Sequence, residues 1–159
     1  MGDVPHKRHS LHGDGAGSRL AEELMGEEGF RGASSLLYHR GSPSAVTAVE
    51  HYPVARSPLT ANDPLLPWHL RAAHLEPSGD LVTGRRLLMG NANVAICWSA
   101  ATTSSPLYRN AAGDELYYIQ AGEAVFESVF GALPVAAGDY LVVPASTTGR
   151  WVVNDDDPL

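Results

Sequence analysis

The chain is poor in cysteine, in basic residues and in long apolar runs, and each shortage narrows what the protein can be. Cys97 is the one cysteine among 159 residues, so no disulfide forms within the chain and the reducing cytoplasm is the expected compartment. Eleven Lys and Arg against eighteen Asp and Glu give a formal net charge of −7, which argues against a nucleic-acid-binding surface. No apolar run approaches the roughly 20 residues of a transmembrane helix, and the first residues lack the features of a signal peptide. We therefore expect a soluble domain with neither nucleic acid nor membrane as a partner.

The two halves of the chain differ in character. Residues 1–79 are rich in Gly, Pro, Ser and His with little sustained alternation, which is typical of an irregular segment with short strands. Within this segment, Ser18 is placed to cap a short helix over residues 18–25. Strands are expected at residues 34–39 and 45–49, followed by an extended, proline-rich passage.

Residues 80–159 carry the stronger strand signal. Strands are expected at residues 85–88, 94–99, 115–120, 124–130, 133–136, 140–143 and 150–154. Turn positions between neighbouring strands indicate an antiparallel meander, and Gly138 and Asp139 are expected to form the tight turn before residues 140–143. Alternation within the third of these strands places Glu115 and Tyr117 on one face, and Leu116 and Tyr118 on the other.

Two segments of the second half are laid out like the paired motifs of a cupin. They cover residues 106–122 and 138–151. The resemblance implies a mainly β fold, a cupin-like antiparallel β-barrel of the jelly-roll type, with the irregular N-terminal segment wrapped on it as one structural unit.

The metal ligands of that motif are largely missing. A metal-binding cupin takes two histidines and a glutamate from the first motif and a histidine from the second, because a mononuclear site needs several converging ligands. Tyr108 and Asn110 stand where the first two histidines belong, Gly149 stands at the last, and only Glu115 remains. One carboxylate does not hold a catalytic iron, so we expect this chain to bind no metal.

Four segments in order extend the resemblance to nearly the whole chain. Residues 20–30, 34–40, 83–91 and 108–116 together resemble the N-terminal half of a bacterial homogentisate 1,2-dioxygenase. Members of that family use one non-haem Fe(II) and O₂ to open the ring of homogentisate, giving maleylacetoacetate in tyrosine and phenylalanine catabolism. Their iron is held by two histidines and one glutamate of the C-terminal half. The resemblance implies that this chain contains no catalytic residue and that its partner is the missing C-terminal half or further copies in a homo-oligomer.

Alternatives to this interpretation remain open. The chain could be a standalone, metal-free module that binds a small aromatic acid, with a charge pair between Glu115 and Arg109 filling the vacated site. The candidate pocket then comprises Tyr108, Arg109, Asn110, Glu115, Tyr118 and Trp151.

Other polar residues have weaker signals. A metal clip at His69, His74 and Glu76 has a spacing that fits no strong zinc pattern, so surface histidines are the favoured interpretation. Cys97 is expected to be a small buried hydrophobe, and His39 a hydrogen-bonded anchor. The apolar strands at residues 94–98 and 140–143 are expected to expose an apolar surface that a homo-oligomer would bury.

Overall fold

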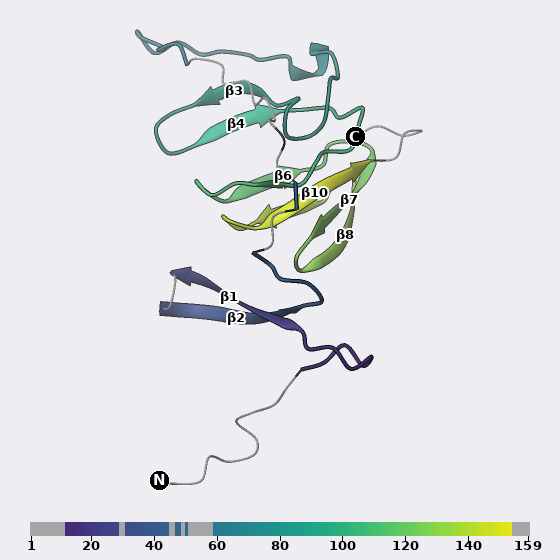
Figure 1. Ribbon diagram of the computed structural model, residues 1–159. Coiled ribbons are helices and arrows are strands. Elements are labelled where there is room, and N and C mark those ends of the chain that lie inside the picture. Colours follow the sequence, from purple (N-terminus) through teal and green to yellow (C-terminus); the bar gives the residue numbers. More distant parts are fainter. Residues whose placement is uncertain (1–11, 29–30, 45–46, 49, 51–58, 154–159) are drawn as a thin grey trace. The chain divides into compact units, whose positions relative to one another are not determined.

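The computed structural model describes residues 12–28, 31–44, 47–48, 50 and 59–153 (Figure 1). The chain divides into two compact units, residues 1–51 and 52–159, and each is described by itself. Both described parts consist mainly of strands, with a short 3-10 turn, η2, at Ala72–His74, so the predicted β class is confirmed. None of the described residues belongs to a helix long and apolar enough to cross a membrane. The strand predicted at residues 45–49 and the prolines Pro53 and Pro58 fall wholly or partly outside the described residues.

The first unit is built on an antiparallel pair, β1 (Ala21–Glu28) and β2 (Arg31–His39). The strand predicted at residues 34–39 lies within β2, whereas the helix predicted over residues 18–25 is wrong, because most of this segment is β1. An isolated helix of this length, followed directly by Gly26, is marginal, and pairing with β2 instead supplies inter-strand hydrogen bonds along one edge of β1. His39 anchors the pair through a hydrogen bond of 2.9 Å between its Nε2 and Oε2 of Glu23.

The second unit holds the remaining described strands, and all but the short strand at Tyr108–Arg109 overlap predicted ones. They are β3 (Arg86–Gly90), β4 (Ala95–Trp98), β5 (Tyr108–Arg109), β6 (Glu115–Tyr118), β7 (Glu123–Ser128), β8 (Gly131–Ala136), β9 (Tyr140–Val143) and β10 (Thr148–Val153). Their order is not the predicted meander: β6 pairs with β9, and β10 lies between β5 and β7 in a four-stranded sheet that ends at β8. β3 and β4 form a separate two-stranded sheet.

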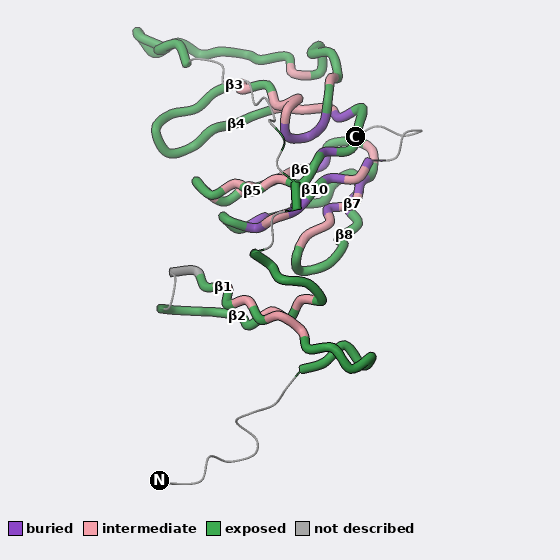
Figure 2. Tube along the Cα trace, viewed as in Figure 1, coloured by how far each residue is buried: buried purple, intermediate pink, exposed green. Residues whose placement is uncertain are grey.

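The core of this unit lies between the β6–β9 pair and the four-stranded sheet (Figure 2). Alternate residues of β9, β7 and β10 are buried, as period-two alternation requires when one face of each strand packs inward. Trp151 is fully buried and contacts Phe126 and Tyr117, with ring centroids 5.0 and 4.8 Å from its own. The opposite face of β6–β9 stays exposed, with Leu116, Tyr118, Tyr140 and Val142 between 56% and 68% accessible.

The arrangement is consistent with a cupin-like sheet fold but is open. The described strands form four separate sheets, and β4 and β6 each have a hydrogen-bonded neighbour on one side. No closed barrel is formed by the described residues, so the predicted closure is not observed there. The turn predicted before β9 is present, where Gly138 has a φ of +96° and Asp139 accepts a hydrogen bond from the backbone N–H of Ala136.

Candidate functional site

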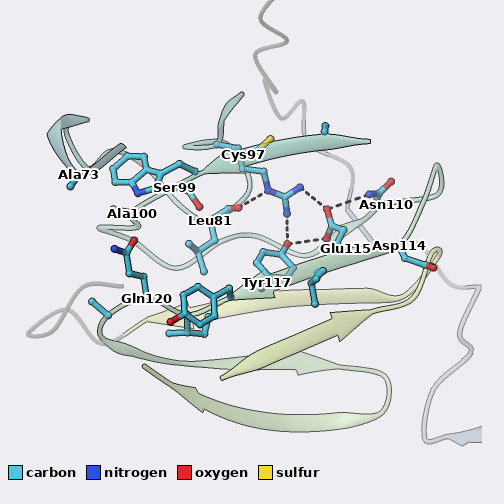
Figure 3. Close-up of a pocket in the computed structure, with 17 residues that line it drawn as sticks. Ala73, Leu81, Cys97, Ser99, Ala100, Asn110, Asp114, Glu115, Tyr117 and Gln120 are labelled. Carbon is cyan, nitrogen blue, oxygen red and sulfur yellow. Dashed lines mark hydrogen bonds and ion pairs between the residues drawn. The ribbon is translucent and has the colours of Figure 1, made fainter. Parts of the chain in front are cut away.

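Glu115 is the centre of a hydrogen-bonded polar cluster in the second unit (Figure 3). Arg85 donates from Nη1 to its Oε1 at 2.5 Å, and Asn110 donates from Nδ2 to the same oxygen at 3.3 Å. Its Oε2 accepts from the hydroxyls of Tyr108 at 2.7 Å and Tyr117 at 2.9 Å. The carboxylate therefore has four side-chain donors, and its own side chain is only 10% exposed.

Strand alternation explains how these groups meet. Glu115 and Tyr117 share the inner face of β6, as the sequence predicts, and both turn toward the four-stranded sheet. Tyr108 comes from β5 in that sheet, and its hydroxyl lies 2.9 Å from the hydroxyl of Tyr117. The cluster thus joins the two layers of the unit.

Arg85 enters from the loop before β3. Its guanidinium lies over the rings of Tyr108 and Tyr117, at 5.7 and 5.5 Å from their centroids, and also donates to the Tyr117 hydroxyl. Its Nε donates to the carbonyl oxygen of Leu81 at 2.8 Å. Arg85 therefore satisfies the carboxylate electrostatically and fastens its loop to β6.

The loop that carries Arg85 has its own internal support. Asp80 Oδ1 accepts from the backbone N–H groups of Val82 at 2.7 Å and Thr83 at 3.1 Å, and its Oδ2 accepts from the Thr83 hydroxyl at 2.6 Å. The position after Thr83 must be a glycine, since a Cβ on residue Gly84 would lie 2.0 Å from the carbonyl oxygen of Ser78. The start of β3 is consequently fixed relative to this turn.

The cluster shifts the ionisation of its members in a consistent direction. Burial alone would raise the pKa of Glu115, but the hydrogen bonds from Arg85 and Tyr108 and the positive charge of Arg85 outweigh it, so the pKa is lowered. Burial raises the pKa of Tyr117 and of Tyr108. Burial would lower the pKa of Arg85, yet Tyr117 and Glu115 raise it overall. At neutral pH the cluster is an ion pair with two neutral phenols.

The residues at the expected ligand positions do not fit an iron ion. Glu115 already has a guanidinium and two hydroxyls on its oxygens, which would have to leave before a metal could bind. At the second-motif position, a Cβ on Gly149 would lie 2.5 Å from Cζ of Phe126 and 2.8 Å from the carbonyl oxygen of Glu127. A histidine at that position has no room beside Phe126 and Glu127.

The remaining candidate residues are spread over different environments. Arg109 does not pair with Glu115 as expected; its Nε donates to the Thr148 hydroxyl at 2.8 Å on the exposed side of β5, because Tyr108 and Arg109 are successive residues of one strand. Tyr118 is 56% exposed on the outer face of β6, whereas Trp151 is enclosed in the core. Of the six candidate residues, Asn110, Glu115 and Tyr118 line one cavity, whereas Tyr108, Arg109 and Trp151 are not among its lining residues.

The expectation for Cys97 is corrected by the structure, whereas His69 and His74 are exposed, as favoured from the sequence. Cys97 is exposed rather than buried. No group of three or more His, Cys, Asp or Glu side chains in the described part of the chain is arranged to hold a metal ion, so the clip at His69, His74 and Glu76 does not form.

A cavity of about 660 Å³ adjoins the cluster in the second unit. It is lined on one side by residues 114–121 without interruption and on the other by Ala95 and residues 97–100. Leu81 and Arg85 also border it, and Figure 3 labels Leu81 and Cys97 across from Glu115 and Tyr117. The cavity thus runs between β4 and β6.

Sequence reasoning missed Arg85 as the partner of Glu115. The available signal was the predicted inward direction of Glu115, since a buried carboxylate needs a cation or several donors. Arg85 and Arg109 both met that requirement. Only the fold decides between them, because Arg85 lies 30 positions before Glu115 in the sequence.

Comparison with known proteins supports a relationship to dioxygenases. The chain is 35% identical over 150 residues to a protein of Saccharolobus solfataricus named "Putative dioxygenase SSO1533". The match covers 93% of this chain but 39% of that protein, so the chain spans less than half of its relative. No family model matches the chain, and no solved structure matches it. The relative's name specifies no substrate, and the sequence similarity relates this chain to part of a dioxygenase-like protein.

Proposed function

We propose that this chain is the N-terminal, cupin-like portion of a homogentisate 1,2-dioxygenase, and that it contributes structure rather than the catalytic iron. The substrate assignment rests on the four sequence segments that resemble that family, and the similarity to a dioxygenase-named protein supports the broader class. In this proposal the Fe(II), the ring-opening chemistry and the catalytic residues belong to polypeptide outside these 159 residues.

The observation that carries the proposal is that the carboxylate oxygens of Glu115 already accept hydrogen bonds from other side chains of this chain. The carboxylate that a metal-binding cupin would use is occupied by Arg85, Tyr108 and Tyr117. A guanidinium supplies the positive charge and planar donor set that a buried carboxylate requires. The site is therefore built to hold two layers of the fold together without a metal.

The test combines metal analysis with oxygen uptake. The purified chain is loaded anaerobically with Fe(II), desalted, analysed for bound iron and then supplied with homogentisate and O₂. We expect less than stoichiometric iron and no substrate-dependent oxygen uptake. Glu115→Gln is the matched control, because iron held only at nonspecific surface sites will be the same in both proteins.

Stoichiometric iron that is lost in Glu115→Gln, together with ring opening, would overturn the proposal. The homogentisate assignment has a separate test in the longer relative, which is assayed for oxygen uptake on homogentisate. If the relative consumes oxygen with another substrate but not with homogentisate, the substrate assignment fails while the structural role stands.

A further inference from the structure

We propose that the gap between β4 and β6 receives an extended polypeptide segment, which pairs with the free edge of β6 as an additional strand. The occupant we infer is a segment of polypeptide equivalent to the part of the Saccharolobus relative that lies outside the match. The proposal goes beyond the proposed function and takes from it only that this chain works together with further polypeptide.

The residues that line the cavity indicate that it lies along the edge of a strand. A cavity above a sheet face touches alternate residues of a strand, because side chains alternate between the two faces. This cavity touches residues 114–121 consecutively, along the whole of β6 and beyond both of its ends. On the other side it touches Ala95 and residues 97–100, the latter at the end of β4 and beyond.

The backbone of β6 has hydrogen-bonding groups directed into this gap. Ile119 donates its N–H to the carbonyl oxygen of Asp139 at 3.0 Å and accepts from the N–H of Gly138 at 2.8 Å, so its backbone groups point toward β9. In an antiparallel pair these directions alternate along the strand. The N–H and C=O groups of Leu116 and Tyr118 therefore point away from β9, to the edge that no described strand covers.

The inserted segment would complete the layer opposite the four-stranded sheet. β3 and β4 form one two-stranded sheet and β6 and β9 another; the gap follows β6 over its whole length, and on the other side it borders Ala95, Cys97 and Trp98 of β4. One strand between them would join all four into a single sheet of five. An open edge of this kind is a ready template for strand addition, in which main-chain hydrogen bonds supply affinity.

The surroundings of the gap define the chemistry of the occupant. On the inner side the segment would lie beside the ion pair of Arg85 and Glu115, whose charges cancel. On the outer side it would lie beside Leu116 and Tyr118, which are 66% and 56% exposed. A segment with small or polar side chains facing inward and apolar side chains facing outward matches both environments.

The test uses overlapping synthetic peptides of about ten residues, the upper range of strand length, spanning the unmatched part of the Saccharolobus relative. Binding to the ¹⁵N-labelled full chain is followed by amide chemical shifts and hydrogen exchange. We expect at least one peptide to shift and protect the amides of Leu116 and Tyr118. Homogentisate is titrated in parallel, and if it shifts these amides while no peptide does, the gap is a small-molecule site and the proposal fails.

Three variants separate edge pairing from loss of a side chain. Tyr118→Pro removes an N–H that points into the gap, and we expect at least a tenfold loss of peptide affinity. Val142→Pro removes the equivalent outward N–H on the opposite edge of the same sheet, and Tyr118→Val changes the side chain but keeps the N–H. Both are expected to bind within about threefold of the unchanged chain.

The contrary results are equally definite. Equal binding by the two proline variants, no peptide that shifts the β6 amides, or full protection of Leu116 and Tyr118 amides without peptide would each refute strand insertion. A peptide carrying N-methyl groups on alternate residues tests the same pairing without changing the protein. The peptide-binding results do not depend on the iron-binding and oxygen-uptake results, so failure of strand insertion and failure of the proposed function are distinguishable.

Discussion

Replacing Glu115 with glutamine should destabilise the second unit substantially, because it removes one charge from a largely buried pair. The amide keeps the shape of the side chain but leaves the Arg85 guanidinium without its counter-ion and two tyrosine hydroxyls with a weaker acceptor. Breaking a buried pair costs about 3–5 kcal/mol, and we place this one near 3 kcal/mol because Arg85 is 27% exposed. For a domain of this size such a loss lowers Tm by roughly 10–20 °C.

The assay is urea unfolding at pH 7 followed by tryptophan fluorescence, which reports on the enclosed Trp151. Glu127→Gln is the matched control. Glu127 also pairs with an arginine, Arg150, at 2.7 Å, but both side chains are more than 40% exposed, so the loss should be below about 1 kcal/mol.

A double-mutant cycle tests the mechanism itself. Arg85→Met combined with Glu115→Gln removes both charges, so the double variant should lose clearly less stability than the sum of the two single losses. If Glu115→Gln changes the free energy of unfolding no more than Glu127→Gln does, the cluster does not hold the two layers together and the reasoning about the site is wrong.

Three further outcomes are expected. Because the pKa of Glu115 is lowered, the stability it contributes is fully present above the ordinary glutamate value of 4.5 and is lost as the pH falls through its lower folded pKa. In urea unfolding at stepped pH, the free energies of unfolding of the unchanged chain and of Glu115→Gln should therefore converge below pH 4.5. A difference that stays constant with pH would contradict this. Tyr117→Phe should cost about 1–2 kcal/mol by removing a hydroxyl that bonds Glu115, whereas Tyr118→Phe, on the exposed face, should cost less than about 0.5 kcal/mol in the same assay. Gly149→Ala should cost about 1–3 kcal/mol because its Cβ meets the Phe126 ring, and Gly113→Ala, with open space around it, should change stability by less than about 0.5 kcal/mol; equal losses would show that Gly149 is not crowded.

Local patterns in the sequence were sufficient for most strands of the second unit and for the faces of β6. Alternation depends on neighbouring residues alone, so the grouping of Glu115 with Tyr117 and of Leu116 with Tyr118 could be predicted before any fold was known. The turn at Gly138 could be predicted for the same reason. The absent cupin histidines are likewise a property of the sequence, visible at Tyr108 and Asn110.

The tertiary structure decided what lies far apart in the sequence. Helix and strand compete closely over short segments, and pairing with β2 determined the outcome for β1. Both Arg85 and Arg109 could have neutralised Glu115, and the direction of β5 removed Arg109 from the choice. The pairing of β6 with β9 rather than with β7 left one edge of β6 open, because strand order depends on packing of the whole unit and not on the residues of one strand.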